Sequence, residues 1–298
     1  MNRPELKNSS NISGHFKSSR TTTAVFSAIA LCVLSACGGG GGGGDSSAEI
    51  PGGATPVSPT PTPTPTPTTG SNSDCGEDGN VLTVAGNTAQ IDGNVYYTDG
   101  TTVISTQQRK FATSNGATFR DRTGLFQITQ VNATTYTNAA VNGSFGGSVI
   151  TTTENDYSSV VGDVRQTYGL TISNLFQGVT TTASSYFTPY AYTGASVNPA
   201  LGTAYTASYS TTTQSGGTTS PTLAQTSITT YSTESVTVLA GTFPACKIKL
   251  EVTGGATVAN VSYAWRVASG RYKGLVVRTA NASGVKTSEA TRLLVNGQ

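Results

Sequence analysis

The chain has 298 residues, of which only 11% are charged, and its formal net charge is +2. A chain this close to neutral has no electrostatic basis for binding nucleic acid and no polybasic patch for an anionic membrane surface. Glycine is abundant (35 residues), tyrosine (13) outnumbers phenylalanine (9), and threonine and asparagine recur throughout. Since threonine and tyrosine favour strands and glycine and asparagine favour turns, the composition predicts an all-β fold.

The first 20 residues are polar and basic, and an apolar run follows from Ala24 to Leu34. This run has the length of a signal peptide and is shorter than the roughly 20 residues that a membrane-spanning helix needs. It ends in Leu34-Ser35-Ala36-Cys37, which resembles the lipobox of bacterial lipoproteins. The resemblance implies that residues 1–36 are a signal peptide, cleaved before Cys37, and that the Cys37 thiol receives diacylglycerol. The alternative is an ordinary secretory signal with a cysteine there by chance.

Cleavage before Cys37 would change the composition. The leader carries four basic residues and one acidic residue, so the remaining chain has a formal net charge of −1. The one histidine, His15, also leaves with the leader. A mature chain without histidine excludes histidine-based catalytic triads, histidine-ligated zinc and the usual general base near pH 7. We expect no cofactor. By the lipoprotein resemblance, Gly38 after the cysteine favours the outer membrane, with the periplasmic or exterior face left open.

Residues 37–74 form the predicted tether. Gly38 to Gly44 is an unbroken glycine run, and proline occupies every second position from Ser58 to Thr68, with threonine between the prolines. Such segments bury no apolar surface and stay unfolded. The threonine-proline run favours polyproline II at about 3.1 Å per residue, or roughly 35 Å in all. It is interpreted as a spacer, with an O-glycosylated stalk as the alternative.

Residues 75–298 are predicted to form one β-rich domain. Runs rich in threonine, valine, isoleucine and tyrosine alternate with turn signals, a pattern typical of antiparallel hairpins. We therefore expect an antiparallel meander that forms a curved sheet, a sandwich or a barrel-like domain. The turn signals are Asp92-Gly93-Asn94, Asp99-Gly100, Asn115-Gly116, Asn142-Gly143, Gly216-Gly217, Gly254-Gly255, Ser269-Gly270 and Ser283-Gly284.

The strand pattern is clearest in the C-terminal third. Apolar and charged residues alternate without interruption from Cys246 to Val252, which predicts one core face and one solvated face. In the next strand, Val261, Tyr263, Trp265 and Val267 share a face. Further core residues are predicted in Leu275-Val276-Val277 and Leu293-Leu294-Val295.

The segment that leads into Cys246 contains Ala240-Gly241-Thr242-Phe243. It resembles the A-G-T-F hairpin of exported β-rich bacterial proteins, many of them uncharacterised lipoproteins with curved sheets like those of lipoprotein carriers. Trp265 and Gly274-Leu275-Val276 stand where those proteins have a tryptophan strand and a G-L-V turn. Between them this chain has Ala268-Ser269-Gly270-Arg271 in place of Pro-Gly. The resemblance implies a fold more than an activity.

Four cysteines are present. Cys32 is removed with the signal peptide and Cys37 is the predicted lipidation site, so Cys75 and Cys246 are the cysteines available in the folded domain. Because export delivers the chain to an oxidising compartment, these two are expected to form a disulfide. Free thiols or a metal site are the alternatives, although a metal would lack partner ligands.

Acidic residues recur along the domain. Two carboxylates about 5 to 9.5 Å apart would suit glycoside hydrolysis, and a cluster at a turn would suit calcium. Since aspartate is common in turns, a structural role is favoured over both, and no metal site is predicted. The candidates are Asp74, Glu77, Asp78, Asp92, Asp99, Glu154, Asp156 and Asp163.

The basic residues Arg109, Lys110, Arg120 and Arg122 lie on predicted strands together with Asp121. A solvated sheet face accounts for such a pattern, and an anion site is the alternative. The interpretation is therefore a charged outer surface.

Aromatic residues alternate farther along the chain. Rings two residues apart on a strand share a face, where they either line a groove for sugar or lipid or pack across strands. Cross-strand packing is the favoured interpretation. The residues are Tyr186, Phe187, Tyr190, Tyr192, Tyr205 and Tyr209.

These observations predict a membrane-tethered β module of the cell envelope that acts as a non-enzymatic binding or structural protein. Its predicted partners are the membrane, through the N-terminal lipid, and an apolar or glycan ligand on a concave sheet face. A surface-exposed adhesin is the alternative, and an enzyme that works through carboxylates is a third hypothesis. The sequence leaves the ligand and the oligomeric state open.

Overall fold

The computed structural model describes residues 74–138, 142, 146–191, 197–254 and 257–298. The predicted signal peptide, Cys37 and the tether up to residue 73 lie outside these ranges. A 3-10 helix, η2 (Val81–Thr83), precedes the strands. In the described part of the chain, no helix is both long and apolar enough to cross a bilayer.

The strands follow one another with short connections. The first six are β1 (Thr88–Tyr96), β2 (Val103–Phe119), β3 (Arg122–Tyr136), β4 (Val149–Val161), β5 (Val164–Phe176) and β6 (Val179–Ala191). The remaining strands are β7 (Ala204–Ser215), β8 (Thr218–Thr219), β9 (Leu223–Val238), β10 (Gly241–Gly254), β11 (Thr257–Val267), β12 (Val276–Asn281) and β13 (Lys286–Val295).

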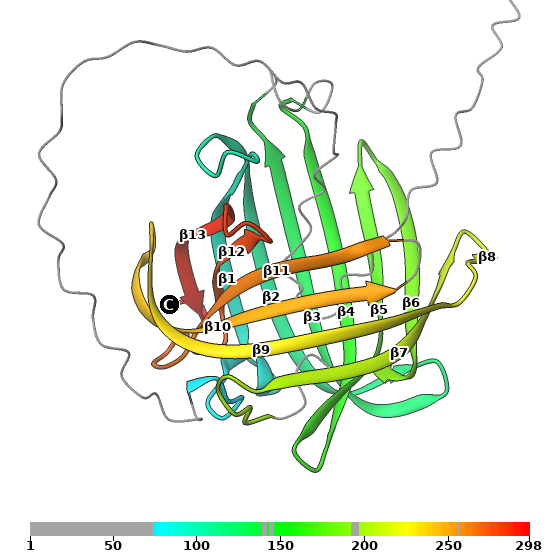
Figure 1. Ribbon diagram of the computed structural model, residues 1–298. Helices are drawn as coiled ribbons and strands as arrows, with labels where there is room; N and C mark the ends of the chain where they lie inside the picture. Colours follow the sequence, from blue (N-terminus) through cyan, green and yellow to red (C-terminus); the bar gives the residue numbers. More distant parts are fainter. Residues whose placement is uncertain (1–73, 139–141, 143–145, 192–196, 255–256) are drawn as a thin grey trace, which may run out of the picture.

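The strands form a closed antiparallel barrel. From β1 to β6, and again from β9 to β13, each strand pairs with its neighbour in the chain. Pairing of β1 with β13 and of β6 with β7 closes the ring into 12 strands, with the two-residue β8 as a side strand on β7. In Figure 1, β9 to β11 run across the front of β2 to β6, so the barrel has two facing halves. The prediction of an all-β antiparallel meander is confirmed, and the barrel-like form is the one adopted.

Four of the eight turn signals coincide with turns or bends and two lie inside strands, while Asn142-Gly143 and Gly254-Gly255 lie partly outside the described residues. Asp92-Gly93-Asn94 belongs to β1, where Gly93 sits at a bulge against the Glu289 carbonyl and a side chain would clash. Asn115-Gly116 belongs to β2, where the pairing with β3 shifts register. Both turn predictions were wrong because glycine also occurs at β-bulges, where a strand bends within the sheet and does not reverse direction.

The main core lies where the C-terminal strands meet β1 and β2. Trp265, Val267, Leu275 and Val277 are buried there with Ile91 and Phe111. On β10, Ile248 and Leu250 point into the barrel and are buried, while Lys247 and Lys249, which precede them in turn, are partly exposed. The alternation predicted for this strand is therefore confirmed.

The interior of the barrel also contains polar side chains. Arg109 on β2 is only 2% exposed, and Asn132 on β3 is its register partner. Glu154 and Asp156 on β4 are buried on the same inner face as Gln130. The prediction that Arg109 lies on a solvated face is thus wrong: in β2 it alternates with exposed Lys110, and the alternation places it inside.

The residues that precede β1 close one end of the barrel. Cys75 forms a disulfide with Cys246 of β10, the pair expected from the sequence, and both sulfurs are buried. Glu77 makes a bidentate ion pair with Arg165 of β5, with Nη2 2.7 Å from Oε2. The disulfide, which links residues 171 apart in sequence, and this ion pair hold the segment on the barrel.

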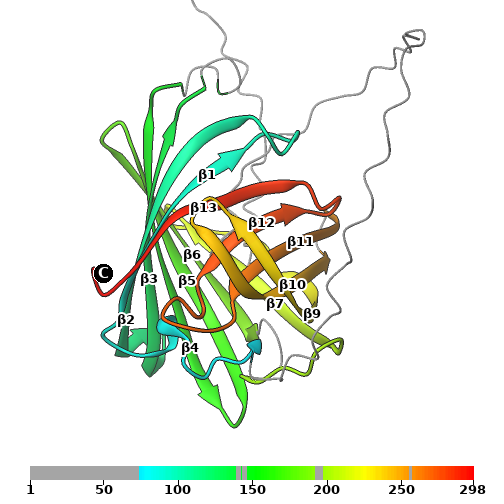
Figure 2. The ribbon, with the colours of Figure 1, turned by 90° about the vertical axis from the view of Figure 1, so that its left-hand side faces the viewer.

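The tip of the β2–β3 hairpin folds back over the outside of the barrel. We call residues 117–125 the arm. Phe119 in the arm stacks on Tyr157 of β4 with ring centroids 4.6 Å apart. Leu125 and Tyr168 of β5 complete the buried cluster. The arm is thereby held against β4 and β5, and Figure 2 shows the long β2–β3 hairpin from the side.

Candidate functional site

The candidate site arises where β6 separates from β5. Gly169 pairs with Tyr186, but the next rung of the ladder joins Thr167 to Ala191. Residues 187–190 therefore bulge out opposite Tyr168. Pro189 lies in this bulge, and because proline has no N–H it cannot continue the ladder. The bulge leaves a gap in the β5–β6 hydrogen-bond ladder beside the arm.

The arm is positioned by a glycine. A Cβ on Gly169 would overlap the ring of Phe119 and would also approach the Ser185 carbonyl oxygen closely. Phe119 can therefore lie on the β5 backbone only because residue 169 has no side chain. This contact places the turn that follows Phe119 at the edge of the gap.

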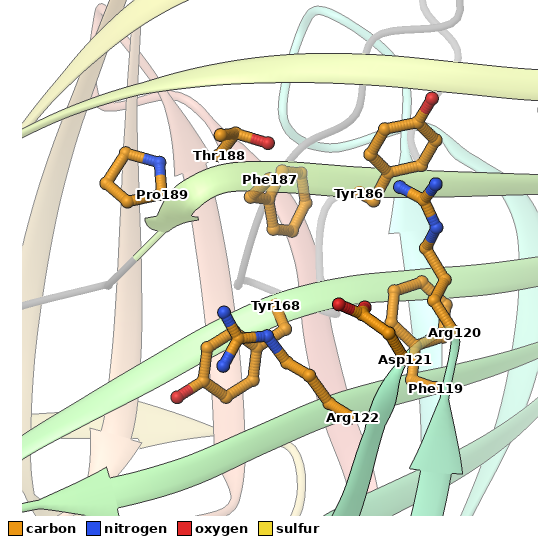
Figure 3. A pocket seen from close by; sticks show the side chains of 9 residues that line it. All are labelled: Phe119, Arg120, Asp121, Arg122, Tyr168, Tyr186, Phe187, Thr188 and Pro189. Atoms are coloured by element: carbon orange, nitrogen blue, oxygen red, sulfur yellow. The ribbon is translucent and has the colours of Figure 1, made fainter.

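Between the arm and the bulge lies a pocket of about 520 Å³, here called the arm pocket. Figure 3 shows Arg120 and Arg122 reaching from the arm toward tyrosines of β5 and β6, with Asp121 between them. The pocket is lined by Phe119, Arg120, Asp121, Arg122, Tyr168, Tyr186, Phe187, Thr188 and Pro189.

Each arginine lies over a tyrosine ring. The guanidinium carbon of Arg120 is 3.8 Å from the ring centroid of Tyr186, and that of Arg122 is 4.1 Å from the centroid of Tyr168. The Tyr168 hydroxyl donates to Gln166 at 2.8 Å and lies 3.0 Å from Ser159 Oγ. These contacts fix the Tyr168 ring, so Arg122 stacks on a rigid platform.

The two guanidinium groups have no acidic partner. Among the described residues, neither Arg120 nor Arg122 forms an ion pair, and Asp121 is within ion-pair distance of neither. Both arginines are exposed. The pocket therefore presents two cations against one carboxylate, and each guanidinium covers one face of a tyrosine ring. It can receive an anionic group through charge-assisted hydrogen bonds.

The predicted acidic candidates have structural roles. Asp99 accepts hydrogen bonds from the Thr101 and Thr102 amides and the Thr102 hydroxyl, and these bonds lower its pKa to about 2. Asp92 pairs with Arg292 at 2.9 Å.

The other acidic candidates do not meet at the pocket. Glu154 and Asp156 share the inner face of β4, and none of the eight acidic candidates for catalysis or calcium lines the arm pocket. Within the described ranges, no three histidine, cysteine, aspartate or glutamate side chains are grouped for a metal ion.

Some of the alternating aromatic residues line a pocket, and others pack across strands. Tyr186 lines the arm pocket, and Tyr190 packs edge-on against Tyr168. Tyr205 and Tyr209 pack inside the barrel, edge-on against Tyr231 and Phe187. Burial raises the pKa of Tyr209 to about 12. Tyr192 lies outside the described residues.

The sequence did not identify the arm pocket. Arg120 and Asp121 form a turn, not a strand, and they meet β6 only through the folded-back hairpin. Pro189 within a β-rich run was the available signal, because proline inside a strand marks an edge or a bulge.

Comparisons with known proteins give one distant structural likeness. No family model matches the chain, and no curated protein does. A crystal structure of a "putative exported protein with YmcC-like fold" from Bacteroides fragilis NCTC 9343 aligns with a TM-score of 0.31 and 8% sequence identity. The alignment covers 71% of this chain and 96% of that one.

Proposed function

We propose that this chain is an envelope lipoprotein that binds a glycan without catalysing a reaction. Lipid on Cys37 holds it at the membrane, residues 37–74 act as a spacer, and the barrel presents the arm pocket. The lipobox-like sequence Leu34-Ser35-Ala36-Cys37 and the apolar run before it support the anchor. The arm pocket supports the binding role.

One observation carries the choice of a glycan: two tyrosines and two arginines without acidic partners line one open pocket. A sugar ring has a rim of hydroxyls that accept hydrogen bonds from guanidinium groups, and an apolar face that can pack beside the tyrosine rings. Binding sites of this kind combine aromatic surface with a few placed polar groups. At about 520 Å³, the pocket lies within the range of about 300–1,000 Å³ usual for small-molecule sites.

The interior of the barrel is less suited to an apolar ligand. A cavity of about 160 Å³ lies inside, below the usual size for a ligand site. Its lining includes the charged residues Glu77, Arg109, Arg165 and Arg266. Removing such groups from water against an acyl chain costs free energy. Between the two ligand classes expected from the sequence, the glycan is therefore favoured.

Binding is tested with the full-length chain in detergent against a panel of fluorescent neutral and acidic oligosaccharides, read by anisotropy. We expect binding to at least one member. Tyr186→Ala should weaken it about tenfold or more, because a central aromatic anchor contributes about 2 kcal/mol. The control is Tyr97→Ala, since Tyr97 is exposed and lies outside the pocket lining. Failure of every oligosaccharide to bind, or wild-type affinity in Tyr186→Ala, overturns the proposal.

The anchor is tested by radiolabelled palmitate. Label in the wild type and none in Cys37→Ala is the expected result, and label in neither overturns the anchor. Protease treatment of intact cells then distinguishes the alternative role: if external protease clips the chain, the protein is a surface-exposed adhesin. Protection in intact cells and cleavage after the outer membrane is opened assign a periplasmic binder.

A further inference from the structure

We propose that the arm pocket is one of two subsites of a continuous groove, and that the groove holds a chain in which an acidic sugar adjoins a neutral one. This inference rests on the proposed glycan binding and names the ligand class. It follows from a second hollow on the other side of the β6 bulge.

The second hollow has a volume of about 350 Å³ and lies along β7, β9 and the end of β10. It shares Thr188 and Pro189 with the arm pocket, so the two hollows meet at the bulge. Each alone lies within the size range of small-molecule sites. A ligand that fills both must be extended, as an oligosaccharide is.

The lining of the second hollow differs from that of the arm pocket in charge. None of its lining residues, all of them in the described part of the chain, is charged. They offer mainly hydroxyl and amide groups on small side chains. The lining consists of Thr188, Pro189, Ser208, Tyr209, Ser210, Ala224, Gln225, Thr226, Thr253 and Gly254.

These polar groups are held in place by one another. Ser208 Oγ lies 3.3 Å from Thr226 Oγ1, and Thr253 donates to the Thr226 carbonyl at 3.4 Å. The Thr211 hydroxyl donates to Gln225 Oε1 at 2.8 Å on the opposite face of these strands, where Tyr209 and Thr211 are buried. Side-chain hydroxyls and amides both donate and accept, as sugar hydroxyls do. The second subsite therefore suits a neutral sugar.

The arm pocket has the opposite character. Its two unpaired guanidinium groups favour a carboxylate, since arginine recognises carboxylates through paired N–H donors. An acidic sugar in the arm pocket places its neighbour in the chain across Thr188 and Pro189. An acidic sugar next to a neutral sugar thus matches the change from a charged to an uncharged lining along the groove.

The test uses isothermal titration of the full-length chain with tetrasaccharides that alternate a uronic acid with a neutral sugar. Each is paired with its carboxyl-reduced form, which differs only in charge. We expect the acidic form to bind about tenfold tighter or more than the reduced form. Arg122→Gln should remove that difference, whereas Lys110→Gln, the same charge change on the exposed face of β2, should keep it.

The second subsite is tested by Thr226→Val combined with Ser208→Ala, since these two residues pair on the same face and both line the hollow. This double variant should weaken tetrasaccharide binding about tenfold and leave the affinity for the uronic monosaccharide unchanged. Thermal unfolding confirms that each variant is folded. Equal affinity for acidic and reduced forms, or full affinity in the double variant, overturns this inference while glycan binding stands. Absence of any oligosaccharide binding overturns the proposed function as well.

Discussion

Two regions of the molecule lay cations over aromatic rings, yet they differ in the acidic partners and in the open space beside those cations. In the arm pocket, Arg120 and Arg122 cover tyrosines and have no acidic partner among the described residues. In the second region, Trp265 of β11 lies between Lys247 and Arg278, 5.2 Å and 4.8 Å from its ring centroid.

Glu234 accounts for the difference at Lys247, whereas Arg278 forms no ion pair among the described residues. It accepts a hydrogen bond from the indole N–H of Trp265, and it lies 3.6 Å from Lys247 Nζ. Trp265 is only 5% exposed and belongs to the main core. A cation stacked on a ring is thus compatible with a purely structural cluster. The feature that indicates a binding site is the open pocket beside Arg120 and Arg122.

The largest expected effect that separates the two regions is on stability. Trp265→Ala should lower the free energy of unfolding by about 3–5 kcal/mol, as large-to-small changes at buried aromatics do. Urea denaturation measures this, and glycan affinity of the folded fraction should not change. Trp265→Phe, which keeps a ring, is the control and should cost clearly less. Loss of binding with stability intact in Trp265→Ala would contradict the assignment of this cluster as structural.

The second-largest expected effect is on the arm pocket, through the contact between Gly169 and Phe119 that supports the arm. Gly169→Ala puts a methyl group into the ring of Phe119 and against the Ser185 carbonyl oxygen. Overpacking of this kind costs about 1–3 kcal/mol, and the arm should lift from β4 and β5. Trypsin cleavage after Arg120 and Arg122 should become faster than in the wild type, and glycan binding should fall.

Phe119→Leu is the comparison for that experiment, because it keeps apolar contact and removes the stack on Tyr157. We expect a smaller increase in trypsin cleavage from Phe119→Leu than from Gly169→Ala. If Gly169→Ala leaves the trypsin cleavage rate unchanged, the arm is not held by this contact.

A smaller effect on stability should follow from changing one cation in each region. Exposed cation–π contacts and exposed ion pairs each contribute about 0–1 kcal/mol, so Arg122→Gln and Lys247→Gln should both shift the unfolding free energy only within that range. They should differ in binding. Arg122→Gln should weaken the acidic glycan, whereas Lys247→Gln should not. Equal binding losses in both variants would mean that the two regions do not differ in function.

The sequence predicted the strands better than it predicted the pocket. The alternation from Cys246 to Val252 predicted β10 and its inner face because burial on one side of a strand is a local pattern. The arm pocket instead depends on a register change near Gly169 and on a hairpin that folds back to meet it. Such contacts join residues distant in the chain, and a single sequence has no local signal for them.

A single sequence also cannot distinguish the different structural roles of an aspartate or a glycine. Asp99-Gly100 predicted a turn correctly, whereas Gly93 serves a bulge inside β1. A turn aspartate and a pocket aspartate also look alike in sequence. Asp99 accepts three hydrogen bonds within its turn, while Asp121 in the arm accepts none among the described residues.

The smallest expected effect tests this contrast between the two aspartates. Hydrogen bonds from Thr102 and the Thr101 amide lower the Asp99 pKa from 3.8 to about 2. Because the folded-state pKa is depressed, the stabilisation by Asp99 is complete above pH 3.8 and is lost as the pH falls through about 2. Thermal unfolding between pH 2 and 5 should show this loss in the wild type and a flatter profile in Asp99→Asn. Asp121→Asn should keep the wild-type profile of stability against pH in that range, because the Asp121 carboxylate supports no hydrogen bonds of its turn. If Asp121→Asn flattens the profile as much as Asp99→Asn does, Asp121 is a structural residue.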